Sequence, residues 1–321
     1  MNITSPETMD NVPEHIAQCL QLAILLEASA YPKPGNVHRT FDFQKTRYEH
    51  FLASSVALAP HFKNAANQNP VSANRTMLGN AGIGRIIKNA VIDVAAWQHG
   101  GNTLLGSIIL LIPMAVAAGL TQAQSTRFSV NRFRLNLRSV VESTTAEDAV
   151  NVYDAINIAQ PGGLGRVPRL DVTDAESKKK ILNKGTSLFE VFRISSSWDT
   201  ISAEWINNYH VTFDIGYPSF KLQLKQTKDI NAAIVHTFFK ILSEVTDTLI
   251  IRKAGLEKAK WASSQAKQIL EAGGLTTEKG RKNILELDRK LHDPDHKLNP
   301  GTTADVTSAC IALAVLNGYR P

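Results

Sequence analysis

The sequence predicts an all-α fold: a single large multi-helix domain around a buried central apolar helix, with a small irregular excursion. Apolar residues recur every three to four positions along most of the 321 residues, which is the period of helices that pack on a core. Strand patterns do not alternate with these helices, which argues against a doubly wound sheet. Because 43% of the residues are hydrophobic, the chain can bury a sizeable core. We expect one domain over 1–321, a core over about 13–317 and an excursion over about 166–228.

The periodicity predicts helices, in chain order, at about 13–30, 46–66, 80–98, 102–120, 128–142, 146–159, 199–209, 230–253, 255–272, 277–291 and 302–317. Prolines end the first of them at Pro32 and Pro34, because a proline ring cannot continue a helix. Gly100-Gly101 separates the third from the fourth. Thr144 or Thr145 caps the helix at 146–159, with acids in its first turn.

The stretch at 104–120 is strongly apolar, and residues 100–125 carry no formal charge. Its length is close to that of a membrane-spanning helix. However, Gly106, Pro113 and Gly119 interrupt it, and aromatic or basic residues do not mark both of its ends. We therefore expect the central helix of a large core and no membrane partner.

The second half of the chain begins with the excursion, which includes an expected extended run at 210–215. The helix at 230–253 ends in Arg252, Lys253 and Gly255, a pattern typical of a helix C-terminus. Gly273-Gly274 ends the next helix, and the turn at Pro300-Gly301 starts the last one.

Composition restricts the cellular setting and the partners. The two cysteines, Cys19 and Cys310, lie in apolar helical patterns, as expected for reduced thiols of a cytoplasmic protein. The segment 1–11 is polar and lacks a targeting pattern. A net charge of +6 suits phosphorylated small molecules as well as nucleic acid. The arginines at 127–138 are more typical of a solvated helix face, so no nucleic-acid partner is expected.

The first helix carries an acid, Glu27, on the same stripe as Ile16, Leu20 and Ala23. A charge on that stripe is costly unless a cation, a metal or hydrogen bonds compensate it. The helix is followed directly by Pro32-Lys33-Pro34-Gly35, a rigid turn that presents cations. These features predict an anion cradle beside a buried acid, or else an ordinary helix stop with solvated cations.

Other acids also occupy apolar stripes or the starts of apolar helices. They are Asp148, Asp247, Asp288 and Asp305. A single inward acid is usually a helix cap or a hydrogen-bond acceptor, but acids converging from several helices can hold a divalent metal. The set therefore predicts a Mg²⁺ site that bridges a polyphosphate.

Glycine-rich turns precede two helices, at Gly79–Gly84 and at Gly100–Gly106. Such helix starts can bind anions through backbone N–H groups, although neither turn has the spacing of a P-loop. In the second turn, Asn102 and Thr103 would form the polar tip of the buried helix. The alternative is a tight turn with close helix packing at Gly106.

Four motifs in this order resemble the triphosphoribosyl-dephospho-CoA synthase family. They are Pro-Lys-Pro-Gly-Asn-Val-His-Arg at 32–39, Gly-Asn-Thr-Leu-Leu-Gly at 101–106, Asp-Thr-Leu-Ile-Ile-Arg-Lys-Ala-Gly at 247–255 and Asn-Pro-Gly-Thr-Thr-Ala-Asp at 299–305. The resemblance extends from about 18 to 317. The residues at 35–43, with Asp-Val-Thr-Asp at 171–174 and Glu204-Trp205, resemble the archaeal-type branch.

The resemblance implies that the triphosphoribosyl group of ATP is transferred, by attack at its ribose C1′, to a hydroxyl of 3′-dephospho-CoA or a related acceptor, with release of adenine. It implies Mg²⁺ as the cofactor, held by Asp247, Asp288 and Asp305. Glu27 or Asp148 would be the catalytic base or would stabilise an oxocarbenium-like C1′. Substrate and phosphate contacts would come from Lys33, His38, Arg39, Asn102, Thr103, Arg252, Lys253 and Thr302. A homodimer is a further expectation.

Two other functions fit the same residues. A Mg²⁺-dependent helical phosphohydrolase would use the same acids, but would release phosphate or pyrophosphate and no adenine. A non-catalytic nucleotide-binding helical protein would bind without turnover, although burying unused acids would lower its stability.

Overall fold

The computed structural model describes residues 12–68 and 78–321. Across these two ranges the chain is helical and contains no strand, apart from an isolated bridge between His38 and Phe41. The all-α prediction is therefore confirmed. The polar segment 1–11, for which the sequence predicts no targeting role, lies outside the described residues.

The described helices begin with α1 (Val12–Ser29), α2 (Tyr48–Ala66), α4 (Ile83–Trp97), α5 (Leu105–Gln124), α6 (Val130–Glu142) and α7 (Ala146–Ala159). The excursion holds α8 (Ala175–Lys184), α9 (Leu188–Ser195), α10 (Thr200–Ile206), the π-helix η2 (Val211–Gly216) and α11 (Tyr217–Thr227). The chain ends with α12 (Ile230–Glu244), α13 (Thr248–Ala254), α14 (Leu256–Glu271), the 3₁₀ turn η3 (Gly274–Thr276), α15 (Glu278–Leu291) and α16 (Gly301–Leu316).

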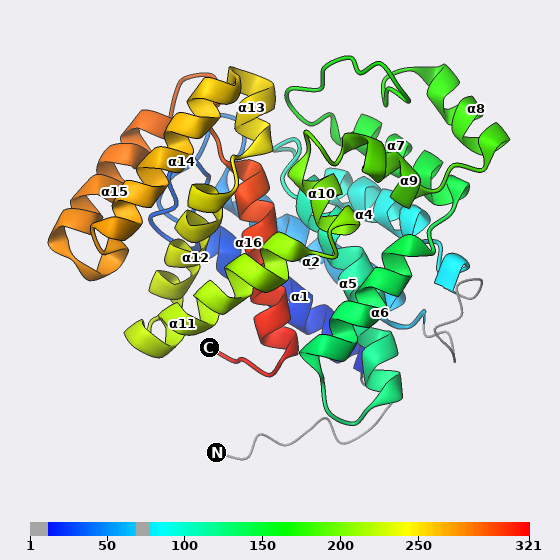
Figure 1. Ribbon diagram of the computed structural model, residues 1–321, viewed down its shortest axis with the longest axis horizontal. Helices are drawn as coiled ribbons and strands as arrows, with labels where there is room; N and C mark the ends of the chain where they lie inside the picture. The colour runs from blue at the N-terminus through cyan, green and yellow to red at the C-terminus, as the bar shows by residue number, and fades with distance from the viewer. Residues whose placement is uncertain (1–11, 69–77) are drawn as a thin grey trace.

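Two apolar helices, α5 and α16, form the middle of the molecule. In Figure 1, α16 runs down the centre with α1 beside it, and α5 lies next to both. The most apolar stretch of α5 is 89% buried, so this helix, although long and apolar enough to cross a membrane, is a core helix here. The buried apolar residues from Ile16 to Leu316 form one cluster. The predicted buried central helix is confirmed.

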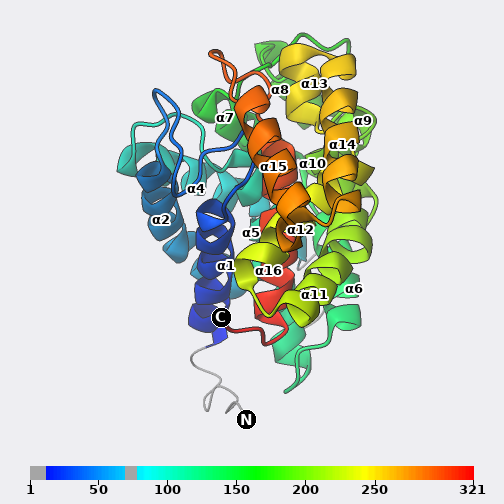
Figure 2. The ribbon, with the colours of Figure 1, turned by 90° about the vertical axis from the view of Figure 1, so that its left-hand side faces the viewer.

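The outer helices surround this core from two sides. Figure 1 shows α14 and α15 side by side at the left, and α7 to α10 at the upper right. Figure 2 shows α13 at the same end of the bundle as the loops that join α7 to α8 and α15 to α16. Residues of the motifs at 32–39, 247–255 and 299–305 line one cavity, so the turn after α1 and the start of α16 meet α13 near that end.

The predicted helix at 230–253 is divided into α12 and α13. The division falls at Val245–Asp247, where the Asp247 carboxylate accepts hydrogen bonds from Leu249 N (2.9 Å) and Ile250 N (3.0 Å). A side chain that bonds to backbone N–H groups in this way starts a helix. The periodicity continues across the division, which is why the sequence pattern did not reveal it.

The extended run predicted at 210–215 is wrong, because these residues form the π-helix η2. The buried Glu204 carboxylate explains the difference: it accepts hydrogen bonds from Val211 N (2.7 Å) and Thr212 N (2.9 Å). These bonds satisfy backbone donors at the start of η2, a task that helix caps perform. The β-branched residues Val211 and Thr212 favour strands only in the absence of such contacts.

Candidate functional site

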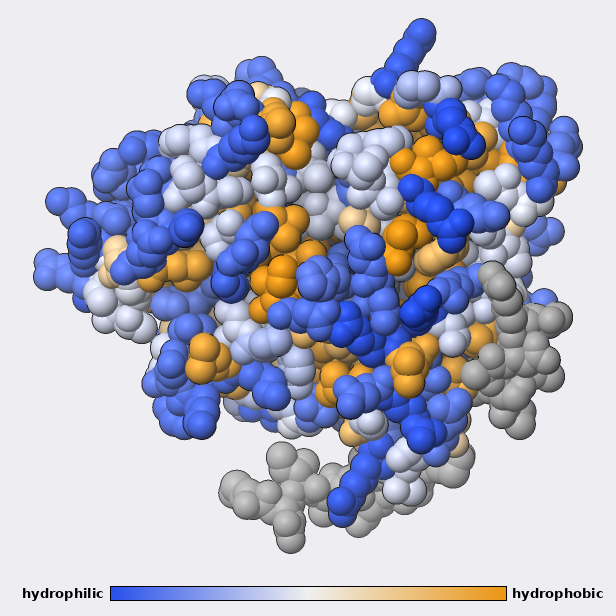
Figure 3. All heavy atoms as spheres, in the orientation of Figure 1, coloured by the Kyte–Doolittle hydropathy of each residue, from blue (hydrophilic) through white to orange (hydrophobic). Residues whose placement is uncertain are grey.

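A cavity of about 740 Å³ opens at the end of the bundle where these motifs meet. Eight of the residues that the sequence proposes for the site line it: Glu27, Lys33, Asn102, Thr103, Arg252, Lys253, Thr302 and Asp305. Five others do not line it: His38, Arg39, Asp148, Asp247 and Asp288. The molecular face in Figure 3 is mostly polar, with apolar patches between the polar residues.

The floor of the cavity holds a buried ion pair between Glu27 and Lys33. Glu27 lies in the last turn of α1 and is 4% exposed, and Lys33 in the following turn is 2% exposed. Lys33 Nζ donates to the Glu27 carboxylate and, at 2.9 Å, to the Glu27 backbone carbonyl. Burial raises the pKa of Glu27, although the Lys33 charge opposes this. The predicted pairing of a buried acid with a cation turn is therefore present in the structure.

The turn that carries Lys33 is held against the C-terminal end of α15. Asp288 Oδ1 accepts a hydrogen bond from Gly35 N (3.2 Å), and Asn299 Nδ2 donates to Gly35 O (3.0 Å). His292 links α15 to the turn, because its Nδ1 lies 3.1 Å from Asp288 Oδ1 and its Nε2 lies 3.3 Å from Asn36 O. Gly35 has φ +72° and no room for a Cβ, which would lie 2.8 Å from Leu291 Cβ. Asp288 thus positions the turn from outside the cavity.

Replacing His292 with glutamine should reduce stability at acidic pH. Burial lowers the pKa of His292, but the hydrogen bond and charge of Asp288 outweigh it, and the net pKa is raised. A raised folded-state pKa contributes stability that is fully present below the unfolded value of about 6.5 and is lost as pH rises through the folded value.

The wild type should therefore be more stable than His292→Gln by about 1–2 kcal/mol at pH 5.5, and by less at pH 9. Urea unfolding of both proteins at the two pH values measures this difference. His38 and His296 are present in both proteins, and burial, more than the charge of His292, is the cause of the lowered pKa of each. An equal difference at both pH values would show that His292 is neutral in the fold.

Asp305 lies just after the first turn of α16, where this helix meets the start of α5. Its Oδ1 accepts hydrogen bonds from Ser107 N (2.8 Å) and Ser107 Oγ (2.6 Å). Gly106 permits this approach, because a Cβ there would lie 2.2 Å from Asp305 Oδ2. Burial, with the nearby charges of Glu27 and Asp247, raises the pKa of Asp305 to about 7. The close packing expected at Gly106 is thus packing against an acid of the cavity.

Asp247 lies behind the cavity wall and joins two helices. Beyond its bonds to the start of α13, its Oδ2 accepts hydrogen bonds from Thr303 N (2.7 Å) and Thr303 Oγ1 (2.8 Å). Both carboxylate oxygens therefore have protein donors, and burial raises the pKa of this group. Among residues 12–68 and 78–321, no group of three or more His, Cys, Asp or Glu side chains is placed to hold a metal ion. The predicted convergence of Asp247, Asp288 and Asp305 on one ion does not occur.

Asp148, the alternative base, lies away from the cavity. Its Oδ1 accepts a hydrogen bond from Gly84 N (2.8 Å) and its Oδ2 accepts one from Thr145 N (2.8 Å). Gly84 lets α4 pack closely on α7, since a Cβ there would lie 2.2 Å from Asp148 O. The glycine turn at Gly79–Gly84 thus does receive an anion at a helix start, but that anion is a side chain of this protein. Asp148 is a helix cap in this structure.

The other predicted binding residues fall into two groups. In the cavity wall, Arg252 Nη1 donates to Asp199 Oδ2 (2.7 Å) and its buried Nε has no partner. Lys253 Nζ donates to His296 O (3.3 Å), and burial lowers the pKa of this lysine. Asn102 accepts a hydrogen bond from Leu105 N (3.1 Å) and so caps the start of α5.

Outside the cavity, His38 is buried, and burial lowers its pKa to about 4. Arg39 is exposed, with its guanidinium 5.9 Å from the Tyr31 ring. Neither side chain lines the cavity, so the structure separates them from Lys33 in the same turn.

The sequence did not assign roles to several lining residues, chiefly those of the excursion. They include Arg166, Arg169, Asp171, Trp198, Asp199 and Ser107. One signal was present, because Asp-Val-Thr-Asp at 171–174 stood out in an irregular stretch. Its contact with the other motifs depends on tertiary packing, which no local pattern encodes.

Comparisons with known proteins agree with this arrangement. The family described as CitG, ATP:dephospho-CoA triphosphoribosyl transferase, matches residues 13–321. A protein of Malonomonas rubra named "Probable 2-(5''-triphosphoribosyl)-3'-dephosphocoenzyme-A synthase" is 24% identical over 320 residues, covering 97% of this chain and 90% of that protein. One of Pseudomonas fluorescens (strain Pf0-1) with the same name is 23% identical over 310 residues, covering 96% and 93%.

A crystal structure from Archaeoglobus fulgidus, which carries the name of triphosphoribosyl-dephospho-CoA synthase, has the same fold. It superposes with a TM-score of 0.62 at 23% identity, covering 84% of this chain and 100% of that one. Since the family match extends over nearly the whole chain, this protein is a transferase that belongs to the CitG family of ATP:dephospho-CoA triphosphoribosyl transferases.

Proposed function

We propose that this cavity transfers the triphosphoribosyl group of ATP to a hydroxyl of 3′-dephospho-CoA, and that Glu27 is the catalytic base. The observation that carries the proposal is the buried Glu27–Lys33 pair, which shares one cavity with Asp305, Arg252 and Lys253. Cations around the cavity suit a triphosphate, and a buried acid suits proton transfer.

The chemistry requires one bond to break and one to form at the same carbon. The bond from the ribose C1′ of ATP to adenine breaks, and a bond from the acceptor oxygen to C1′ forms. The acceptor hydroxyl gives its proton to Glu27, and the departing adenine takes up a proton from solvent, to which Glu27 afterwards releases its own. Positive charge that develops at C1′ is stabilised by nearby carboxylates, as in glycoside chemistry. Glu27 and Asp305 are the acids of the inner cavity wall.

The inner wall also fits a Mg²⁺ ion that arrives with the triphosphate. Mg²⁺ is commonly held by one or two carboxylates together with substrate phosphates, and needs no cage made of protein alone. Glu27 and Asp305 offer two such carboxylates. Burial and the nearby charge of Glu27 raise the pKa of Asp305, and a cation bound there would favour its anionic form. Bound there, Mg²⁺ would neutralise phosphate charge. Asp247 and Asp288, whose oxygens bond to the protein, would support this site without contacting the ion.

Lys33, Arg252, Lys253 and Thr302 would bind the phosphates, and Asn102 and Thr103 would contact the ribose or adenine. We further propose that the chain works as one domain in the cytoplasm and belongs to the archaeal-type branch. The fold shared with the Archaeoglobus fulgidus protein supports the last point. We also propose that the protein forms a homodimer.

Product analysis tests the reaction. The purified full chain is incubated with Mg-ATP, with and without dephospho-CoA, and the products are separated by HPLC. We expect free adenine and a dephospho-CoA adduct in equal amounts, and loss of both when EDTA removes Mg²⁺. Release of phosphate or pyrophosphate without adenine would instead identify a phosphohydrolase, and ATP binding without turnover would identify a non-catalytic binding protein.

A further inference from the structure

The outer half of the cavity has a different chemistry from the floor. Its walls come from the segment 153–201 and present Tyr153, Ile156, Leu170, Phe192, Trp198 and Ile201, a set that we call the outer lobe. The floor, by contrast, holds the buried Glu27–Lys33 ion pair and the acid Asp305. A cavity that combines an ion pair on its floor with an apolar, aromatic cluster suits a ligand that combines phosphate with a flat ring system.

One wall of the outer lobe is held in a fixed conformation. The Asp171 carboxylate accepts hydrogen bonds from Val167 N (2.8 Å) and Thr173 N (2.7 Å). Tyr153 Oη, on α7, donates to Leu170 O at 2.5 Å, and Leu170 itself has a left-handed backbone with φ +49°. A non-glycine residue is held in this region only where its surroundings determine it. The loop therefore has a fixed conformation, in which Leu170 lines the cavity.

The opposite wall is connected to the phosphate-binding end. Asp199 caps α10 by accepting a hydrogen bond from Ser202 N (2.9 Å), and it also pairs with Arg252 at 2.7 Å. Phe192 packs edge-on against Trp205, with ring centroids 4.9 Å apart. Trp198, which lies between Phe192 and Asp199 in the chain, lines the cavity and is 43% exposed. An indole left uncovered in the wall of a cavity is a surface on which a purine can stack.

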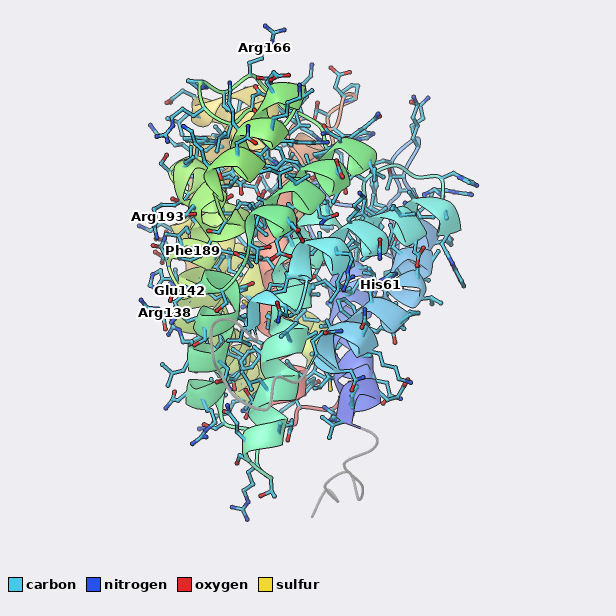
Figure 4. The ribbon with its side chains drawn as sticks, turned by 90° about the vertical axis from the view of Figure 1, so that its right-hand side faces the viewer. His61, Arg138, Glu142, Arg166, Phe189 and Arg193 are labelled. Atoms are coloured by element: carbon cyan, nitrogen blue, oxygen red, sulfur yellow. The ribbon has the colours of Figure 1, made fainter. Side chains whose placement is uncertain are left out.

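The position of the outer lobe in the cavity indicates which nucleotide it binds, the donor ATP or the acceptor. The donor triphosphate needs the inner cations, of which Lys33 is 2% exposed. The lobe is open to solvent at Trp198, which is 43% exposed, and Leu164 of the same segment is 41% exposed, so we place the mouth of the cavity on this side. An acceptor of the dephospho-CoA type carries a long arm on its diphosphate, and this arm has to extend through the mouth. Arg166 and Arg169 lie at that rim, and Figure 4 shows Arg166 extending outward from this end of the molecule.

We propose that the outer lobe binds the purine of the acceptor nucleotide, with Trp198 as its stacking surface. Segment 153–201 then selects the acceptor, while the floor binds ATP. The identification of the acceptor as dephospho-CoA rests on the proposed function.

Kinetics of a single substitution test this assignment. In Trp198→Ala we expect the KM for dephospho-CoA to rise about tenfold, the loss of one base–aromatic stack, while the KM for ATP stays within about twofold of the wild type. Trp97→Ala is the matched control, because Trp97 is 60% exposed on α4 and does not line the cavity. It should leave both KM values unchanged. A rise in the KM for ATP alone, or no change in either, would overturn the proposal.

Tryptophan fluorescence adds a measurement that does not need turnover. Dephospho-CoA added without ATP should quench the wild-type emission, and the quench should be lost in Trp198→Ala but kept in Trp97→Ala. Phosphopantetheine, which has the arm and no purine, should not quench. An equal quench by phosphopantetheine would show that the arm, and not the purine, lies in the lobe. If the wild type quenches normally but releases no adenine from ATP, the proposed reaction fails while the lobe still binds a purine.

Discussion

Glu27→Gln should lower kcat for adenine release from ATP by on the order of 10³-fold, the usual contribution of a general base. Glutamine keeps the size of the side chain and an oxygen that can accept from Lys33, but it cannot take the acceptor proton. The KM for Mg-ATP should change little, because the loss of one Mg²⁺ carboxylate is offset by Lys33, which loses its anionic partner and is left to pair with phosphate. Steady-state kinetics with HPLC detection of adenine separates kcat from KM.

The matched control is Glu14→Gln on the same helix. Glu14 lies in the first turn of α1 and pairs at 2.7 Å with Lys63, both largely solvated. Such a pair contributes at most about 1 kcal/mol, so this variant should keep wild-type kinetics. Full adenine release by Glu27→Gln, measured on protein that unfolds cooperatively, would remove Glu27 from the mechanism.

The helical framework could be predicted because it depends on local periodicity. The apolar stripes of α1, α5 and α16 are visible in the sequence, and the structure has all three at nearly the predicted bounds. The excursion could not be predicted in the same way. Its π-helix depends on the Glu204 carboxylate, and α8 and α11 are short helices of mostly polar residues, so their apolar stripes are weak signals.

The inward positions of the acids could also be predicted, whereas their partners could not. Periodicity places Glu27, Asp148 and Asp247 on buried faces, and all three are buried. What each acid does there is decided by contacts far along the chain: Asp148 with Gly84 and Asp247 with Thr303. Helix caps and phosphate sites use the same residues at helix starts, so a sequence pattern alone cannot separate them.

Asp247 and Asp305 should respond to substitution in opposite directions, because one carboxylate supports the fold and the other serves the site. In the ligand-free protein, Asp247→Ala should lower the free energy of unfolding by about 3–4 kcal/mol, since buried N–H donors of α13 and α16 lose their acceptor. Asp305→Asn keeps an oxygen for Ser107 and removes a charge that burial and Glu27 disfavour.

We therefore expect Asp305→Asn to leave stability unchanged or to raise it, while adenine release falls sharply because Mg²⁺ loses a carboxylate. Urea unfolding without nucleotide, followed by the adenine assay at saturating Mg-ATP, measures both effects on the same preparations. If Asp247 were instead a metal ligand held for function, its removal would relieve the repulsion between neighbouring acids, and Asp247→Ala would be at least as stable as the wild type without metal. That result would place Asp247 in the Mg²⁺ site and reverse the division of roles between the two aspartates.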